Sequence, residues 1–106
     1  MPVPATRIIA CFNLTKGTSA AQYESWARKV DLPTVNRLPS IERFTVHKTT
    51  GILGSDAPAP YQYVEIIDVK DMAVFGRDVA SPEMQKIAAS FREMADVVFM
   101  TTEEVR

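Results

Sequence analysis

Residues 6–14 read Thr-Arg-Ile-Ile-Ala-Cys-Phe-Asn-Leu, with an apolar side chain at most positions. Successive side chains of a β-strand point to opposite faces, so Ile8 and Phe12 share one face while Ile9 and Cys11 share the other. Both faces are therefore apolar. This pattern predicts a strand that lies inside a sheet and is buried on both sides.

The residues after this strand predict a helix. Ser19 is placed to cap it, and Gln22 completes a capping box. Because Pro33 disfavours helical geometry at the residue before it, we expect the helix to end near Asp31, with a short turn or helix over residues 33–38. The core-facing stripe of the helix is expected to contain Tyr23, Trp26, Ala27 and Val30.

Two further strands are expected at residues 41–50 and 61–69, because apolar and polar side chains alternate along both. The connection between them, residues 51–60, is too long for a tight hairpin and carries Ile52 and Leu53 between glycines. We expect this connection to act as a lid or as a dimer arm.

The rest of the chain predicts two helices and a last strand. Asp71 is placed to cap a short helix, and Ser81 followed by Pro82 is typical of the start of a longer one. Residues 97–101 form the fourth predicted strand. The residues expected to face the core are Met72, Phe75 and Val79 in the short helix and Met84, Ile87, Ala88, Phe91 and Ala95 in the longer one.

The resulting order, β-α-β-β-α-β, is that of an α+β, ferredoxin-like sandwich in which the first and third strands are central. We expect residues 1–106 to form one domain of this kind. Its helices would cover one face of the sheet, and the other face would expose apolar side chains of the first strand. Exposed apolar patches mark association, so we expect two sheets to pack together as a dimeric α+β barrel, a homodimer.

The composition is that of an ordinary globular protein, with 46% hydrophobic and 24% charged residues among 106. A formal net charge of −1 gives no reason to expect nucleic acid or a membrane as partner. One cysteine cannot form an intramolecular disulfide, and residues 1–5 lack the features of a signal peptide. We therefore expect a cytoplasmic protein.

Sequence signatures of common cofactors are missing. The chain contains no P-loop, no Gly-x-Gly-x-x-Gly and no Gly-x-Ser-x-Gly. A standard zinc site needs more than the one histidine and one cysteine that the chain carries. We expect neither a metal nor a cofactor.

Five short segments carry a family resemblance: 23–26 (Tyr-Glu-Ser-Trp), 31–33 (Asp-Leu-Pro), 38–41 (Leu-Pro-Ser-Ile), 49–54 (Thr-Thr-Gly-Ile-Leu-Gly) and 61–65 (Tyr-Gln-Tyr-Val-Glu). With them the chain resembles the dimeric α+β barrel superfamily, and most of all the REDY-like (HapK) proteins associated with prodigiosin-type pigment biosynthesis. The resemblance implies a cofactor-independent protein that acts on a small aromatic or heteroaromatic metabolite.

A more distant likeness is to EthD-type proteins, whose first helix ends in a His-x-Pro motif followed by Leu-Pro-Gly. Asp31 stands at the position of that histidine, and Ser40 replaces the glycine. A role that needs a neutral imidazole therefore cannot be transferred. A carboxylate that acts as a base or as a hydrogen-bond acceptor remains compatible with the resemblance.

Asp31 has two interpretations. It follows Tyr23 by eight residues, so a helix that persists this far would place it on or beside the core-facing stripe, where desolvation raises a carboxyl pKa and suits a general base. Alternatively, Asp31 caps the turn that begins near Pro33. The sequence does not choose between these alternatives.

His47 is the only histidine. If the second and third strands pair, we expect Tyr63 and Glu65 on the same face near it, which would give a set of groups for acid–base chemistry. The alternative is a polar layer inside the dimer barrel or at its rim, a commoner use of these residue types.

Four residues are candidates for ligand contact. Tyr23, Trp26 and Phe44 could line a flat pocket for an aromatic ligand, although aromatic residues at such spacings more often form plain core. Asn13 could donate a hydrogen bond to a ligand carbonyl, or it could be a turn residue at the end of the first strand.

Three functions remain open. The first is an enzyme, of the dehydratase or cyclase type, that promotes condensation, dehydration or cyclisation through Asp31, His47, Tyr63 and Glu65. The second is a non-catalytic protein that binds or carries such an intermediate. The third is a cofactor-free monooxygenase, which no residue of the sequence specifically favours.

Overall fold

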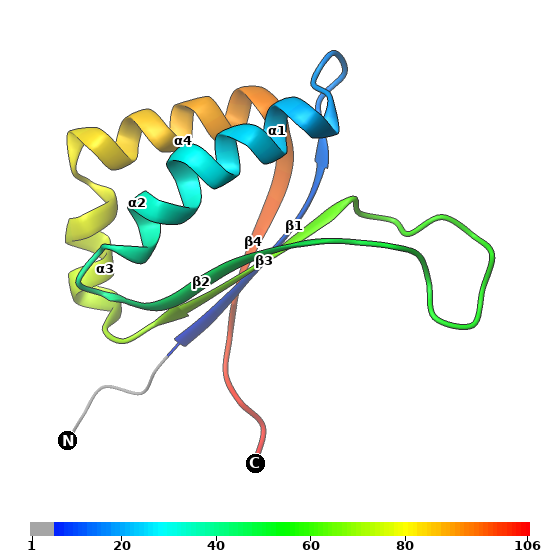
Figure 1. Ribbon diagram of the computed structural model, residues 1–106. Helices are drawn as coiled ribbons and strands as arrows, with labels where there is room; N and C mark the ends of the chain where they lie inside the picture. The colour runs from blue at the N-terminus through cyan, green and yellow to red at the C-terminus, as the bar shows by residue number, and fades with distance from the viewer. Residues whose placement is uncertain (1–5) are drawn as a thin grey trace.

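A four-stranded antiparallel sheet carries its helices on one face (Figure 1). The structure is a computed structural model that describes residues 6–106, so the residues that bear on a signal peptide lie outside it. The elements are β1 (Thr6–Leu14), α1 (Ala20–Trp26), the π-helical turn η1 (Ala27–Asp31), α2 (Leu32–Asn36), β2 (Ile41–Lys48), β3 (Tyr63–Val69), α3 (Met72–Val79), α4 (Pro82–Met94) and β4 (Ala95–Thr102). No helix among them is long and apolar enough to cross a membrane.

The strand order is β2-β3-β1-β4, which places the first and third strands in the centre and confirms the ferredoxin-like α+β fold. On β1, Ala10 and Phe12 face the helices and are fully buried. Ile9 and Cys11 face the other way and are half-buried in the single chain. The two faces of β1 are therefore both apolar, as predicted, but helices cover only one of them.

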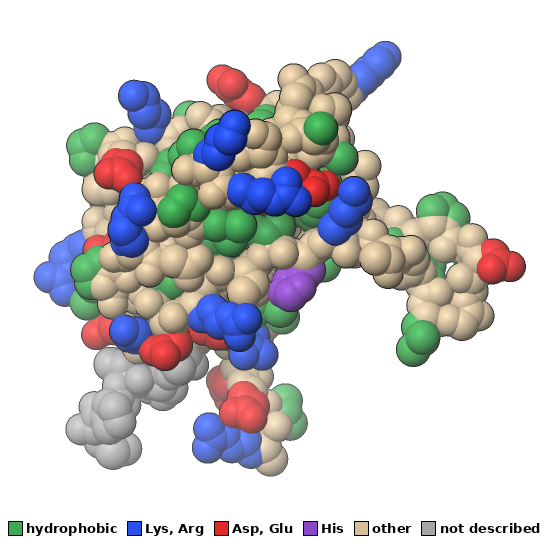
Figure 2. Space-filling model, in the orientation of Figure 1, with side chains coloured by type: hydrophobic (Ala, Val, Ile, Leu, Met, Phe, Trp, Pro, Cys, Tyr) green, Lys and Arg blue, Asp and Glu red, His purple; other side chains and the backbone are tan. Residues whose placement is uncertain are grey.

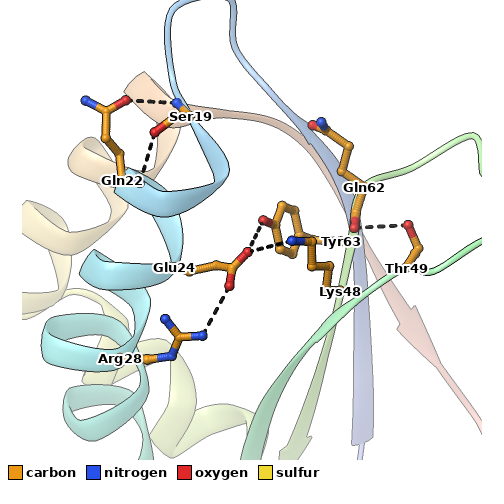
Figure 3. Close-up of polar contacts among 8 residues, drawn as sticks. All are labelled: Ser19, Gln22, Glu24, Arg28, Lys48, Thr49, Gln62 and Tyr63. Carbon is orange, nitrogen blue, oxygen red and sulfur yellow. Dashed lines mark hydrogen bonds and ion pairs between the residues drawn. The ribbon is translucent and has the colours of Figure 1, made fainter.

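The predicted helix caps are confirmed. The Ser19 hydroxyl accepts a hydrogen bond from the Gln22 backbone N–H at 3.1 Å, and the Gln22 side chain accepts one from the Ser19 N–H at 2.8 Å (Figure 3). Asp71 caps α3 and Ser81 caps α4. These local hydrogen bonds satisfy N–H groups that the first turn of a helix leaves without partners.

The predicted boundary near Asp31 and the short helix after it are confirmed, since η1 ends at Asp31 and α2 spans Leu32–Asn36. The backbone nevertheless stays helical across this boundary. Residues Ala27–Asp31 widen into a π-helical turn, in which the Leu32 N–H donates to the Ala27 carbonyl. A new α-helical segment then begins, and Pro33 lies in its first turn. Proline suits this position because its fixed φ of about −65° matches helical backbone.

The π-helical turn also changes which residues face the core. It adds one residue to a helical turn, so the inward position shifts from Val30, which is 37% exposed, to Asp31, which is 5% exposed. The prediction that Val30 faces the core is therefore wrong. A carboxyl group occupies the place where the helical period predicted an apolar side chain.

The connection between β2 and β3 projects from the body of the protein as an arm (Figures 1 and 2). Both strands are shorter at this end than predicted, and Thr49 ties the base of the arm through hydrogen bonds to the carbonyls of Tyr61 and Gln62. At its tip, Leu53 is fully exposed in the single chain. A role as lid or dimer arm stays a prediction.

Four aromatic rings hold the helices against one end of the sheet. Phe12 stacks on Tyr63 with a centroid distance of 5.3 Å, and it meets Phe91 edge-on at 5.0 Å. Tyr23 packs against Tyr63 at 4.9 Å. Because β1, β3, α1 and α4 each contribute one ring, this cluster joins the two layers.

We predict that Phe12→Ala lowers the free energy of unfolding by about 3–5 kcal/mol, because it removes a fully buried ring and leaves a cavity among three others. Urea unfolding followed by circular dichroism measures the change. Leu53→Ala is the control: it also shortens an apolar side chain, but at an exposed position, so its effect should stay within about 0.5 kcal/mol. Equal effects of the two substitutions would contradict this assignment of the core.

Candidate functional site

A cavity of about 240 Å³ lies between the helices and the sheet. Its walls are mainly apolar, and its polar lining comes from Asp31, Glu65, Gln85 and Arg92. The apolar lining residues include Val35, Phe44, Ile67, Phe75, Met84, Ile87, Phe91 and Phe99. An apolar cavity with a few convergent polar groups is the usual form of a small-molecule site.

Asp31 is a buried carboxyl at the end of the π-helical turn, and it lines this cavity. Its side chain makes no capping hydrogen bond, and its backbone is helical on both sides, which rules against the interpretation as a cap. Burial raises the pKa of Asp31 from 3.8 to about 7, because desolvation disfavours the charged form.

Glu65 is a second buried carboxyl, located in the middle of the central strand β3 and only 3% exposed. Its neighbours in the sheet are Val46 on β2 and Ala10 on β1, so the strands offer it no charged partner. Burial, together with the negative charge of Asp31, raises the pKa of Glu65 to about 8. The two carboxyls are thus near enough to repel each other.

The negative charges of Glu65 and Asp31 act on the hydroxyl of Tyr23. Tyr23 is fully buried, and its hydroxyl has no hydrogen-bond partner within residues 6–106. Burial raises the pKa of Tyr23 most, followed by the charges of Glu65 and Asp31. A buried hydroxyl without a partner is costly, so such a group in a native fold calls for an explanation.

The two carboxyls also lack partners. In the described part of the chain, no ion pair or side-chain hydrogen bond reaches Asp31 or Glu65. Carboxyl groups with pKa values of about 7 and 8 hold and release protons near neutral pH. The arrangement can therefore supply both a base and an acid to a molecule in the cavity.

Tyr63 does not join this pair, although it lies on the same face of β3 as Glu65. Its hydroxyl donates to Glu24 at 2.7 Å, and Glu24 also pairs with Lys48 at 3.3 Å and with Arg28 at 3.1 Å (Figure 3). Burial and the bond to Glu24 raise the pKa of Tyr63 to about 12. The same bond, with Lys48, lowers the pKa of Glu24. This network links α1 to the sheet at the base of the arm.

The prediction that His47 lies near Tyr63 and Glu65 is wrong. His47 is paired with Val64 across β2 and β3, so it faces the side of the sheet that no helix covers. Tyr63 and Glu65 face the helices. The ring of His47 is instead within hydrogen-bonding distance of the Thr45 hydroxyl, at 2.9 Å. The prediction requires odd-numbered residues of β2 to lie opposite odd-numbered residues of β3. In the observed register, odd-numbered residues of β2 lie opposite even-numbered residues of β3.

The remaining ligand candidates separate into two groups. Phe44 lines the cavity, and Trp26 stacks on Phe91 at 6.2 Å beside it. Asn13 lies at the end of β1, where its amide donates to the Pro60 carbonyl and accepts from the Gln62 N–H. Both ends of this amide are occupied by the base of the arm, away from the cavity.

Sequence reasoning selected Asp31 and Glu65 separately but missed that they line one cavity. A signal was present at Glu65, because it is the one acidic side chain on the buried side of β3, beside Tyr63, Ile67 and Val69. No set of three or more His, Cys, Asp or Glu side chains within residues 6–106 is arranged to hold a metal ion. The site is thus a pair of carboxyls, not a metal-binding cluster.

The fold and this cavity define a ferredoxin-like α+β protein with an acidic cavity between its two layers. Residues 6–105 match the family of the REDY-like protein HapK. The chain belongs to this family. The crystal structure of HapK from Hahella chejuensis is 33% identical, with a TM-score of 0.77 over 94% of this chain and 92% of that one.

More distant structures share the fold. SnoaB from Streptomyces nogalater, a cofactor-independent oxygenase, is 18% identical, with a TM-score of 0.77 over 98% of this chain and 96% of that one. An EthD-family protein from Bacillus halodurans is 12% identical, with a TM-score of 0.69 over 96% of this chain and 100% of that one. A search of curated proteins found no significant match.

We predict that the stability of the protein falls as the pH rises from about 4 to 8. Below about pH 7 the folded state keeps protons on Asp31 and Glu65 that the unfolded state has released, so each upward pH step favours unfolding until the folded-state pKa values of about 7 and 8 are passed. Glu65→Gln removes one of these titrations. The variant should match the wild type near pH 5 and exceed it near pH 9 by on the order of 2–4 kcal/mol.

Urea unfolding at a series of pH values measures this difference. Glu83→Gln is the matched control, because it makes the same substitution at an exposed position of α4. It should leave the pH dependence unchanged. If Glu65→Gln shows the same pH dependence as the wild type, Glu65 does not titrate as a desolvated carboxyl.

Proposed function

We propose that this protein is a cofactor-independent enzyme that promotes condensation, dehydration or cyclisation of a small aromatic or heteroaromatic metabolite. One observation carries the proposal: Asp31 and Glu65 are brought together, buried and without partners, on the wall of an apolar cavity. Near neutral pH the pair is partly protonated, so one carboxyl accepts a proton while the other donates one.

The walls of the cavity support a ring-bearing substrate. Phe44, Phe91 and Phe99 present aromatic surface, and a volume of about 240 Å³, below the usual range of ligand pockets, limits the substrate to a small molecule. Membership in the REDY-like HapK family agrees with such a role in pigment-type biosynthesis, which we expect in the cytoplasm.

Two other functions would use the same cavity. A carrier would bind the intermediate in the cavity without using the carboxyls for proton transfer. Oxygenation is suggested by the Streptomyces nogalater relative of the same fold, which is a cofactor-independent oxygenase. Consumption of O₂ during turnover distinguishes oxygenation from condensation, dehydration and cyclisation.

We predict that Asp31→Asn lowers turnover by roughly 100-fold or more, because it removes a general base while keeping the size of the side chain. The assay incubates the purified protein with the ring-bearing intermediates made by the products of neighbouring genes. Product formation and O₂ uptake are followed together. Glu83→Gln serves as the control and should retain full turnover.

The outcomes separate the three functions. A folded Asp31→Asn variant with full turnover would remove Asp31 from the catalytic machinery. Stoichiometric binding of an intermediate without any change in rate, for the wild type, would favour the carrier.

We also propose that the protein is a homodimer that packs through the uncovered face of its sheet. The central part of this face is apolar and only partly buried in the single chain: Ile9, Cys11, Val64, Ile66, Val98 and Met100. Val98 is 52% exposed and Met100 is 43% exposed. A continuous apolar sheet face of this kind favours association, because burial of apolar surface is the main driving force for it.

We predict that Ile66→Glu converts a dimer into a monomer at micromolar concentration, because it places a charge in the middle of the proposed interface. Sedimentation velocity measures the change. Val105→Glu introduces the same side chain in the exposed C-terminal tail and should remain dimeric. Sedimentation of the wild-type protein as a monomer would contradict the proposed homodimer.

A further inference from the structure

The charge of the cavity is unbalanced, which bears on the kind of substrate that it accepts. Asp31 and Glu65 place two acidic groups against one small space, and no basic side chain in the structure's described range pairs with either of them. Buried carboxylates are normally paired with a cation or a metal ion. Here no side chain of residues 6–106 supplies such a cation to Asp31 or Glu65.

The groups around the pair supply no compensating charge. Tyr23 on α1 carries a neutral phenol. The strand residues opposite Glu65 are Val46 and Ala10, which carry no charge. Arg92, on α4, is the one basic residue that lines the cavity, but it is exposed, and its charge contributes to the pKa of neither carboxyl. Arg92 therefore lies at the rim of the cavity and does not neutralise the carboxyls of Asp31 and Glu65.

The carboxyls of Asp31 and Glu65 line the cavity with free hydrogen-bonding capacity, so they form a site for a polar group that is not part of this chain. Their negative charges also act on the buried hydroxyl of Tyr23, which has no partner within residues 6–106. Because the walls beyond them are apolar and aromatic, that polar group must belong to a largely apolar molecule.

We propose that the cavity selects a ring-bearing organic cation, whose positively charged nitrogen lies between the carboxyls of Asp31 and Glu65. A protonated amine, an iminium or a protonated ring nitrogen would meet this requirement. The rings of Phe44, Phe91 and Phe99 can hold the apolar part and add cation–π attraction. The inference rests on the proposed function only in assigning the substrate to this cavity.

A metal ion does not fit the same space. Within residues 6–106 no third carboxyl, histidine or cysteine joins Asp31 and Glu65, and hard metal ions need several such ligands. The apolar walls would also leave most of the coordination sphere unfilled. An organic cation needs fewer polar contacts, because its ring is stabilised by the apolar walls.

Three probes of similar shape and different charge test the proposal: benzylamine, benzyl alcohol and benzoate. Binding is measured at pH 8.5 by shifts of backbone amide signals in NMR titrations. We expect benzylamine to bind at least about tenfold more tightly than benzyl alcohol, and benzoate not to bind, because an anion is repelled by the carboxyls. Between pH 8.5 and pH 6, the affinity for benzylamine should fall by about tenfold as the carboxyls take up protons, while that for benzyl alcohol stays constant.

The double variant Asp31→Asn/Glu65→Gln should bind benzylamine and benzyl alcohol within about twofold of each other, and Glu83→Gln should keep the wild-type preference. Should the double variant fail to fold, the pH titration of the wild type decides alone. Equal binding of the two probes by the wild type, or no binding of benzylamine, would overturn the proposal. Loss of turnover in Asp31→Asn together with equal binding would leave the proposed enzyme in place with a neutral substrate.

Discussion

The π-helical turn between Ala27 and Asp31 determines which side chain at the end of the first helix faces the cavity. It inserts one residue into a helical turn, carries the chain past Pro33 and rotates Asp31 inward in place of Val30. Glu65 on β3 then faces another carboxyl across an apolar space. With this turn Asp31 is 5% exposed and lines the cavity, whereas Val30 is 37% exposed.

Burial of two carboxyls lowers the stability of the folded state at neutral pH, because neither has a partner to offset its desolvation. Natural folds keep such groups where function requires them. The aromatic cluster around Phe12 offsets this cost at the adjacent end of the sheet, where four rings join both layers. The aromatic cluster and the acidic cavity thus lie next to each other between the sheet and the helices, with Phe91 in both.

The polar residues of the chain serve two different purposes. Glu24, Tyr63, Lys48 and Arg28 form a satisfied network that ties α1 to the sheet (Figure 3). By contrast, the Tyr23 hydroxyl has no partner, and no side-chain hydrogen bond or ion pair among residues 6–106 reaches Asp31 or Glu65. Both sets contain carboxyl and phenol groups, so residue type alone does not separate a structural network from a site. What separates them is whether their hydrogen bonds are already made.

The sequence by itself determined the elements and their order, because strand alternation, helix caps and the apolar stripe of α4 depend on neighbours within a few residues. It also indicated Asp31 and Glu65 as candidates. Only the tertiary structure decided that His47 faces away from them, because the register between β2 and β3 depends on contacts across a long connection. It likewise decided the inward turn of Asp31, since a π-helical turn forms only where packing of the finished helix layer compensates its weaker hydrogen bonding.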